Sequence, residues 1–387
     1  MPTPPLQPGH PEWPAVERAW ELYSSMGGKI GAIKAASEGV GRPRETVRDW
    51  ITRYQEWQAA SPGQQAAVER TGLDLAQATH GWRVIKHEDG SRDSVFWRAP
   101  ELPDDTLERI RAAFDGMEPA QLVKPPERVL SDLLAVWPLM DLHMGMHAWA
   151  PETGDVDYDT KRAASDLMEA TEAVLDWTPA TKEAVLILGG DTLHADDNTN
   201  QTPMSKHALD VDGRHYRVVE RCIEAIGYMV ERLLGNCEKL TIRVLRGNHD
   251  MHSHMILTFA LTERYRADQR VVVDKSPRDL FMMQWGRTMI AAHHGDKAKP
   301  ERMALQLADV CPFWSDTRHR YALTGHVHHD QAKDIGGLRW ESLRAFCPPD
   351  AYAASMGYTS RRALQALFFD RQRGLVLRAL DPVERAA

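Results

Sequence analysis

Five short polar clusters between residues 141 and 328 each follow a run of apolar residues. The runs are short and bounded by glycine or polar residues, which is typical of strands buried in a sheet. We expect strands over residues 135–140, 184–188, 241–245, 288–292 and 321–323. The clusters are Asp141-Leu142-His143, Gly190-Asp191, Gly247-Asn248-His249-Asp250, His293-His294-Gly295-Asp296 and Gly325-His326-Val327-His328. Because ligands bind beyond the strand ends of such sheets, the five clusters are expected to meet in space.

The side chains of these clusters are of the kinds that hold divalent metal ions. Asp141 and His143 lie two residues apart, so both can reach one ion where the strand gives way to a loop. Carboxylate, amide and imidazole ligands without cysteine favour Mn, Fe, Zn or similar ions over a structural zinc–thiolate site. Two such ions clamp the attacking and leaving oxygens of a phosphoryl transfer. The clusters therefore indicate a hydrolase of phosphate esters.

In their order, the clusters resemble the pattern of the calcineurin-like metallophosphoesterase superfamily, which is D-x-H, G-D-x-x-D, G-N-H-D/E, H and G-H-x-H, over residues 129–387. The resemblance implies an α/β fold, a two-sheet β-sandwich flanked by helices, with two metal ions. The first ion would be held by Asp141, His143, Asp191 and His328, and the second by Asp191, Asn248, His294 and His326. His294 is preferred to His293 because the family's ligand directly precedes a glycine. Mn²⁺ is the expected metal, with Fe, Zn or Ni as alternatives.

The same resemblance implies that His249 binds no metal and lies beside the scissile phosphate, where it stabilises the transition state or protonates the leaving oxygen. The G-D-x-x-D element departs from the family pattern, because His194 stands where a second aspartate is expected. In relatives that aspartate orients the catalytic histidine. Either His194 has another role, such as contacting phosphate, or Asp250 or Asp196 supplies the support. His194 and Asp250 are therefore predicted, together with His249, as catalytic residues.

The first sixty residues are predicted to form a separate small helical domain. Apolar residues at helical spacing indicate helices over 15–25, 30–38 and 43–57. The second and third helices, joined by a glycine-containing turn, resemble a helix-turn-helix DNA-binding element. Its candidate nucleic-acid contacts are Arg42, Arg44, Arg48 and Arg53. A protein-docking or oligomerisation module is the alternative, because acidic residues of the third helix dilute this charge.

We therefore expect three regions: a helical domain over 1–60, a linker with a β-hairpin and a helix over 61–128, and the catalytic domain over 129–387. The hairpin is predicted from residues 81–86 and 94–98, and the helix from 104–114. The hairpin and the D-L-H-x-G-M-x-A-W stretch from Asp141 resemble metallophosphoesterases encoded by bacteriophages and prophages.

Composition agrees with a protein of the cytoplasm. If the protein is encoded by a phage, this is the cytoplasm of the host cell. The four cysteines form no close CxxC pair, which favours reduced thiols. The chain does not open with a basic segment followed by an apolar stretch, so no secretion signal is expected. No apolar run has the length of a membrane span, so no membrane partner is expected. The net charge of −8 gives no overall basic field, although a local basic patch can still bind nucleic acid.

The sequence thus predicts a dinuclear-metal phosphodiesterase that acts as a nuclease, with DNA as the favoured partner; a homo-oligomer is compatible with it. One alternative is a small-molecule phosphatase or cyclic-nucleotide phosphodiesterase, whose pocket would be closed by loops. The other is a DNA-binding or regulatory protein in which the metal site is vestigial or structural.

Overall fold

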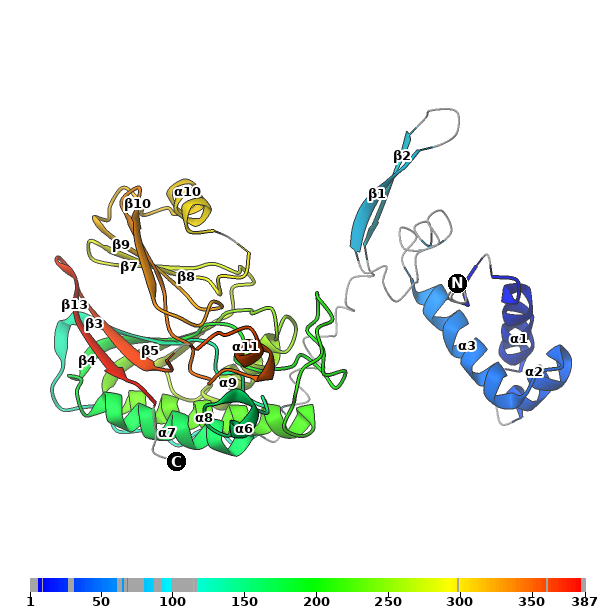
Figure 1. The fold of residues 1–387 in the computed structure, drawn as a ribbon, viewed down its shortest axis with the longest axis horizontal. Helices are drawn as coiled ribbons and strands as arrows, with labels where there is room; N and C mark the ends of the chain where they lie inside the picture. The colour runs from blue at the N-terminus through cyan, green and yellow to red at the C-terminus, as the bar shows by residue number, and fades with distance from the viewer. Residues whose placement is uncertain are drawn as a thin grey trace. The chain divides into compact units, whose positions relative to one another are not determined.

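The computed structural model describes residues 6–8, 10–26, 31–60, 65, 68, 80–86, 92–98, 114, 117–297, 299–359 and 361–383. The chain divides into two compact units, Met1–Thr106 and Leu107–Ala387 (Figure 1). The domain boundaries at residues 60 and 128 remain predictions. None of the described helices is long and apolar enough to cross a membrane.

The N-terminal unit contains the three predicted helices, α1 (Trp13–Ser25), α2 (Ala32–Val40) and α3 (Arg44–Ala59). They pack around a small core of buried side chains, namely Trp13, Val16, Ala19, Ala36, Val47, Trp50 and Ile51. The predicted hairpin is also present, because β1 (His80–Lys86) pairs antiparallel with β2 (Arg92–Arg98). The helix predicted over 104–114 lies outside the described residues, apart from its last position.

The second unit contains a six-stranded sheet in the order β13-β12-β3-β4-β5-β6. Its strands are β3 (Leu130–Leu139), β4 (Thr181–Leu188), β5 (Cys237–Val244), β6 (Val271–Asp274), β12 (Leu364–Asp370) and β13 (Gly374–Asp381). Strands β3 to β6 run parallel, and β12 lies antiparallel to both β3 and β13.

A five-stranded sheet follows the order β10-β11-β9-β8-β7. Its strands are β7 (Phe281–Trp285), β8 (Thr288–Ala292), β9 (His319–Thr324), β10 (Gln331–Ile335) and β11 (Leu338–Ser342). Strands β8, β9 and β11 run parallel, whereas β7 and β10 lie antiparallel to their neighbours. All five strands that we predicted from the sequence are therefore present as β3, β4, β5, β8 and β9.

Helices cover the outer faces of the two sheets (Figure 1). Helices α7 (Thr160–Leu175), α8 (His215–Leu234) and α9 (His254–Arg264) pack on the six-stranded sheet, and α10 (Pro300–Val310) packs on the five-stranded sheet. The short helices α6 (Ala150–Thr153) and α11 (Ala351–Ser355) pack against each other. Helices α7 and α8 connect β3 to β4 and β4 to β5. Such parallel neighbours require a crossover connection of this kind.

The core follows the two-residue period of the strands. Along β3, Leu134 and Val136 pack into the layer between the sheets, where Ile290 and Leu323 of the second sheet meet them. The alternate residues Ala135 and Trp137 point to the opposite face and join the core beneath α7 and α8. On the far side, α10 packs on β8 and β9 in a third cluster. The predicted α/β fold, a two-sheet sandwich flanked by helices, is confirmed.

Candidate metal centre

The predicted ligands lie in the loops that follow β3, β4, β5, β8 and β9, as the apolar runs indicated. Parallel strands present their carboxyl ends at one edge of a sheet. Backbone hydrogen bonds join these loops within each sheet: the N–H of His143 donates to the Asp191 carbonyl at 2.9 Å, and that of Gly325 to the His294 carbonyl at 2.8 Å. The two edges meet, because side chains from both sheets form common groups of potential ligand atoms.

The first group contains Asp141, His143 and Asp191, whose ligand atoms all lie within 4.8 Å of one another. The Nε2 atom of His143 is 3.8 Å from Oδ2 of Asp191. His328 approaches the same place, with its Nε2 atom 3.5 Å from Oδ1 of Asp141. The four residues predicted for the first ion are therefore neighbours.

The second group contains Asp191, His294 and His326, again within 4.8 Å of one another. The Nε2 atom of His294 lies 3.1 Å from Oδ2 of Asp191 and 3.0 Å from Oδ1 of Asn248. His293 lies apart from these contacts, because its Nδ1 atom accepts the backbone N–H of Gly295 at 2.9 Å. The geometry therefore favours His294 over His293 as the ligand.

These side chains suit divalent metal ions by their donor types, and one of them also has a buried nitrogen without a hydrogen-bond partner. His143 is 3% exposed, and its Nε2 atom has no hydrogen-bond partner within the described part of the chain. A buried polar atom without a partner is costly in free energy. Coordination of an ion by Nε2 would remove that cost, and the surrounding carboxylate and imidazole donors suit the same ion.

Backbone strain is concentrated at the predicted ligands. Eight described residues other than glycine have a positive φ, and five of them are Asp141 (50°), His143 (47°), Asp191 (48°), His326 (69°) and His328 (61°). This left-handed conformation costs about 1–2 kcal/mol per residue. Strain of this kind persists where it positions functional side chains. The positive φ lets Asp141 and His143 direct their side chains toward the predicted metal centre, and it does the same for His326 and His328.

Two motif glycines are required for steric reasons. A Cβ atom on Gly247 would overlap the Asp191 carboxylate, and a Cβ atom on Gly325 would overlap the Asp141 carboxylate. Neither overlap can be relieved without moving a predicted ligand. Both motifs therefore begin with glycine because the ligand carboxylates pack directly against the backbone.

The protonation states of Asp191 and His143 suit metal binding, whereas His294 would have to release a proton to bind an ion. Burial by itself raises the pKa of Asp191, but the neighbouring His294 and His249 hold that pKa well below its usual range. Burial alone would lower the pKa of His294, whereas the Asp191 and Asp141 carboxylates raise it to about 10. Burial and the nearby His249 keep the pKa of His143 well below its ordinary value. Asp191 is therefore ionised and His143 neutral, as metal ligands must be.

His249 is held by two hydrogen bonds and lines the cavity described below. Its backbone N–H donates to Oδ1 of Asp191 at 2.7 Å. Its Nδ1 atom lies 2.8 Å from the backbone carbonyl of His194. Because a carbonyl only accepts, Nδ1 carries a proton and Nε2 is the nitrogen that can meet a substrate.

The side chain of His194 contacts a different residue, His143: the Nδ1 atoms of the two rings lie 2.9 Å apart. The ring is 1% exposed, and burial together with His249 lowers its pKa to about 3, so it is neutral. If His143 binds metal through Nε2, its Nδ1–H donates to His194. The His194 ring does not line the cavity described below, so its predicted phosphate contact is not carried into our proposal.

The carboxylates of Asp250 and Asp196 do not contact the His249 ring among the described residues. Asp250 is fully buried and accepts backbone N–H groups from Gly247 at 2.8 Å and Thr192 at 2.9 Å, with longer bonds from Asp191 and Leu193. Asp196 instead holds the backbone and ring of His252. Asp250 therefore joins the loops after β4 and β5, and it enters the proposal as a positioning residue.

A cavity of about 520 Å³ opens beside the predicted ligands. Its lining includes three residues that we did not predict: Cys347, Tyr352 and Tyr358. The two tyrosines are 51% and 57% exposed, and they lie on or just after the short helix α11. None of the three belongs to a recognisable motif, so no sequence pattern indicated them.

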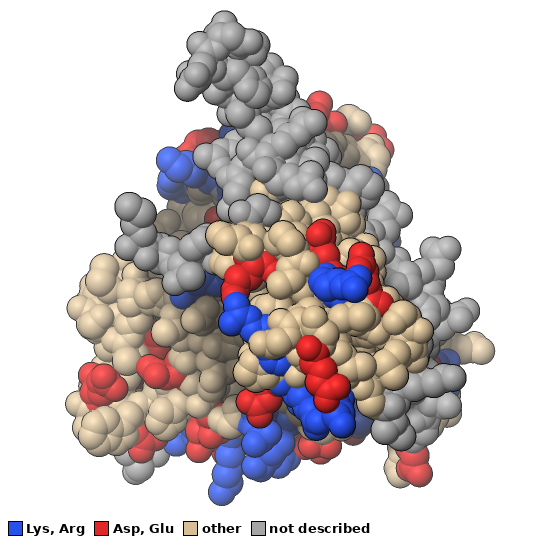
Figure 2. Space-filling model, turned by 90° about the vertical axis from the view of Figure 1, so that its right-hand side faces the viewer, with Lys and Arg blue, Asp and Glu red and all other residues tan. Residues whose placement is uncertain are grey.

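The four arginines predicted to contact nucleic acid differ in their surroundings. Arg42 forms an ion pair with Glu12, and Arg53 pairs with Asp49 at 3.0 Å. Arg44 and Arg48 are exposed and four residues apart in α3, and neither has a carboxylate partner among the described residues. On the face drawn in Figure 2, basic and acidic side chains are interspersed rather than gathered into one basic patch.

Several solved structures are similar to part of this chain. A predicted phosphoesterase from Streptococcus pneumoniae is 12% identical, with a TM-score of 0.26 over 65% of this chain and 99% of that one. Vps29 from Entamoeba histolytica, complexed with Zn²⁺, is 10% identical, with a TM-score of 0.28 over 64% and 99%. An archaeal phosphodiesterase is 11% identical, with a TM-score of 0.32 over 64% and 99%. No family model and no curated protein matches the chain. Such low TM-scores carry no functional argument, so the function must be argued from the side chains.

Proposed function

We propose that this chain is a calcineurin-like metallophosphoesterase with two divalent metal ions, which cleaves phosphodiester bonds of nucleic acid. One observation carries the proposal: the Asp191 carboxylate belongs to both groups of candidate ligands. A carboxylate shared in this way would bridge two ions. The first ion would be completed by Asp141, His143 and His328, and the second by Asn248, His294 and His326. Mn²⁺ is the metal we expect first, with Fe, Zn or Ni as alternatives.

The chemistry follows from charge and position. A pair of divalent ions supplies positive charge at the phosphoryl oxygens and lowers the pKa of water. The carboxylates of Asp141 and Asp191 would by themselves repel a phosphate group, and the ions they hold more than offset this repulsion. These residues fix the place where a phosphate can bind, and their strained backbone holds them in that arrangement.

His249 would act on the oxygen that leaves. Its Nδ1–H is held by the His194 carbonyl, so the ring cannot turn without losing that hydrogen bond. The protonated form of Nε2 would donate a proton to the leaving oxygen, or a hydrogen bond to the developing negative charge. Asp250 would support the same loops through its bonds to backbone amides.

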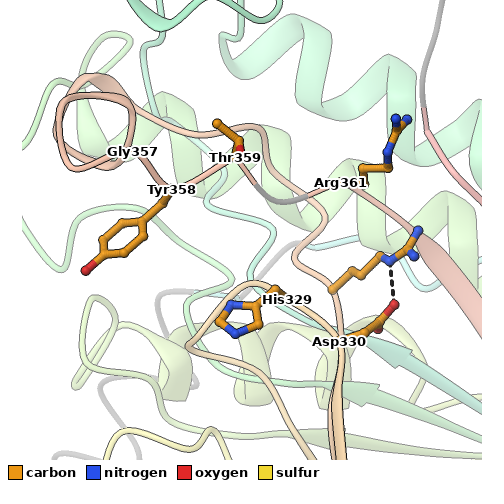
Figure 3. A pocket seen from close by; sticks show the side chains of 7 residues that line it. His329, Asp330, Gly357, Tyr358, Thr359 and Arg361 are labelled. Carbon is orange, nitrogen blue, oxygen red and sulfur yellow. Dashed lines mark hydrogen bonds and ion pairs between the residues drawn. The ribbon is translucent and has the colours of Figure 1, made fainter.

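An extended substrate is favoured because the cavity continues beyond the ligands. His329 and Tyr358 line both the main cavity and an adjoining pocket of about 380 Å³. Figure 3 shows Tyr358 and Arg361 on opposite sides of this pocket, with His329 between them. Arg344 also lines it and forms an ion pair with Asp330. Arg344 and Arg361 carry guanidinium groups of the kind that contacts phosphate oxygens, so the lining of this pocket suits a further phosphate of a polymer.

The exposed tyrosines provide a surface for nucleobases. Tyr352 and Tyr358 are more than half exposed at the edge of the cavity. Aromatic side chains in such positions stack on bases irrespective of sequence, and each stacked base contributes about 1–3 kcal/mol. The aromatic side chains and the arginine-lined pocket together favour a nucleic acid over a small phosphomonoester.

The N-terminal helical unit would serve as a DNA-binding element of the helix-turn-helix kind. Arg44 and Arg48 on the outer face of α3 would contact phosphates or base edges. We propose DNA before RNA on this ground. Within the same proposal, the phage-type layout implies action in the cytoplasm of a host cell.

The proposal is tested by supplying the metal-replete protein with DNA, RNA, cyclic nucleotides and p-nitrophenyl phosphate esters. We expect release of nucleotides from DNA or RNA with Mn²⁺, abolished in Asp191→Asn. Turnover of cyclic nucleotides or monoesters, with no action on polymers, would replace the nuclease by a small-molecule phosphoesterase. Full metal binding without hydrolysis of any ester would leave only a binding or regulatory protein.

A further inference from the structure

The thiol of Cys347 lies among the predicted metal ligands. Cys347 is 4% exposed, and it lines the cavity beside His143 and His328. Its Sγ atom and one ring nitrogen of each of these two histidines all lie within 4.8 Å of one another. The groups that contain Asp191 meet the same limit of 4.8 Å.

The position of this thiol is fixed by the backbone. The N–H of Cys347 donates to the carbonyl of Asp141 at 3.1 Å, and that of Phe346 donates to the carbonyl of Met140 at 2.9 Å. The segment is therefore tied to the loop that carries two predicted ligands of the first ion. The thiol and the D-x-H pair would keep their relative positions in any state in which these bonds persist.

A second observation points to a ligand at this place. The buried Nε2 atom of His143 has no hydrogen-bond partner among the described residues, while Nδ1 of the same ring is bonded to His194. His143 therefore has a free nitrogen in the group that contains the Cys347 thiol. A metal ion bound by both residues would give the Nε2 atom of His143 a partner and would be coordinated by the sulfur of Cys347.

The other three cysteines have ordinary structural surroundings. Cys222 and Cys237 are buried in the core beneath the helices, and the thiol of Cys311 lies 3.4 Å from the sulfur of Met289. None of them belongs to a group of candidate ligands among the described residues. Cys347 thus differs from them by its neighbours, and Cys311 provides a matched control.

We infer that Cys347 is a ligand of the first metal ion, together with Asp141, His143, Asp191 and His328; the inference rests on the proposed metal centre. On binding, the thiol proton would be released to solvent and a metal–sulfur bond would form in its place. A thiolate is a soft ligand that favours Zn²⁺, Fe²⁺ or Co²⁺ over Mn²⁺. The second site offers only nitrogen and oxygen donors, so the two sites would differ in metal preference.

Cobalt tests this inference without reference to activity. The full-length protein is freed of metal with a chelator and loaded with Co²⁺. We expect a sulfur-to-cobalt charge-transfer band in the near ultraviolet, absent from Cys347→Ser and retained in Cys311→Ser. The ligand-field bands in the visible should remain in all three proteins. The Zn²⁺ affinity of Cys347→Ser should also fall by a larger factor than its Mn²⁺ affinity.

The outcomes distinguish a failure of the inference about Cys347 from a failure of the metallophosphoesterase proposal. Ligand-field bands without a charge-transfer band in the wild type would overturn the role of Cys347 and leave the metallophosphoesterase proposal intact. A wild-type protein that binds no cobalt, zinc or manganese would overturn both. Circular dichroism of each variant establishes that it is folded, so a missing band in Cys347→Ser reports on ligation.

Discussion

Replacing His194 with leucine separates the two contacts that this residue makes. The ring nitrogen that lies 2.9 Å from Nδ1 of His143 is lost. The backbone carbonyl that lies 2.8 Å from Nδ1 of His249 is present whatever the side chain. The substitution therefore removes support from one predicted metal ligand and leaves the predicted catalytic histidine in place.

The size of the effect follows from the lost hydrogen bond. His143 would keep a buried Nδ1–H without a partner, which costs about 1–3 kcal/mol. Residues that orient metal-binding histidines contribute about 10–100-fold to metal affinity, which corresponds to about 1.4–2.8 kcal/mol. The two ranges agree. We therefore expect metal affinity to fall about 10–100-fold in His194→Leu, with kcat at saturating metal close to that of the wild type.

Metal affinity is measured by competition with a chelating indicator, and kcat with a p-nitrophenyl diester at metal concentrations that saturate each protein. His194→Asn is the matched control, because its amide oxygen can accept the proton of His143 and should restore most of the affinity. Unchanged metal affinity, with a kcat as low as that of His249→Ala, would refute this division of roles.

Three further substitutions address the catalytic group, the packing of the bridging carboxylate and the N-terminal unit. His249→Ala should retain both metals and lower kcat by about 10²–10⁴-fold; loss of metal, measured by elemental analysis, would contradict the role of this residue. Gly247→Ala should lose metal because its Cβ atom displaces the bridging carboxylate, whereas Gly235→Ala, whose nearest contact is 3.3 Å, should bind metal normally. Changing both Arg44 and Arg48 to alanine should weaken duplex binding and reduce its salt slope by about two, without affecting hydrolysis of a small ester; unchanged DNA binding in a filter assay would exclude these contacts.

The strand ends could be predicted because buried parallel strands have continuous apolar sequences. The starts of the strands were less visible. Strand β3 begins at Leu130, five residues before the predicted start, because its first residues are exposed and therefore need not be apolar. The edge strands β10 and β13 are also largely exposed, so they have no such run to reveal them.

Within the site, residue types and their order could be predicted, whereas local contacts could not. The positive φ of Asp141 and His328 depends on how each loop is held by its neighbours. Asp250 was predicted as support for His249, but its carboxylate is used by backbone amides that no pattern of side chains reveals. His194 supports His249 through a carbonyl, which every residue possesses. Cys347 belongs to no motif, and only the fold brings it to His143 and His328.

The central claim is that two metal ions share the Asp191 carboxylate. Electron paramagnetic resonance of the protein loaded with two equivalents of Mn²⁺ tests it directly, because ions bridged by one carboxylate lie about 3.5–4 Å apart in such sites and their spins couple. We predict the spectrum of a coupled pair in the wild type and its loss in Asp191→Asn. A spectrum of isolated Mn²⁺ ions in the fully loaded wild type would contradict the claim.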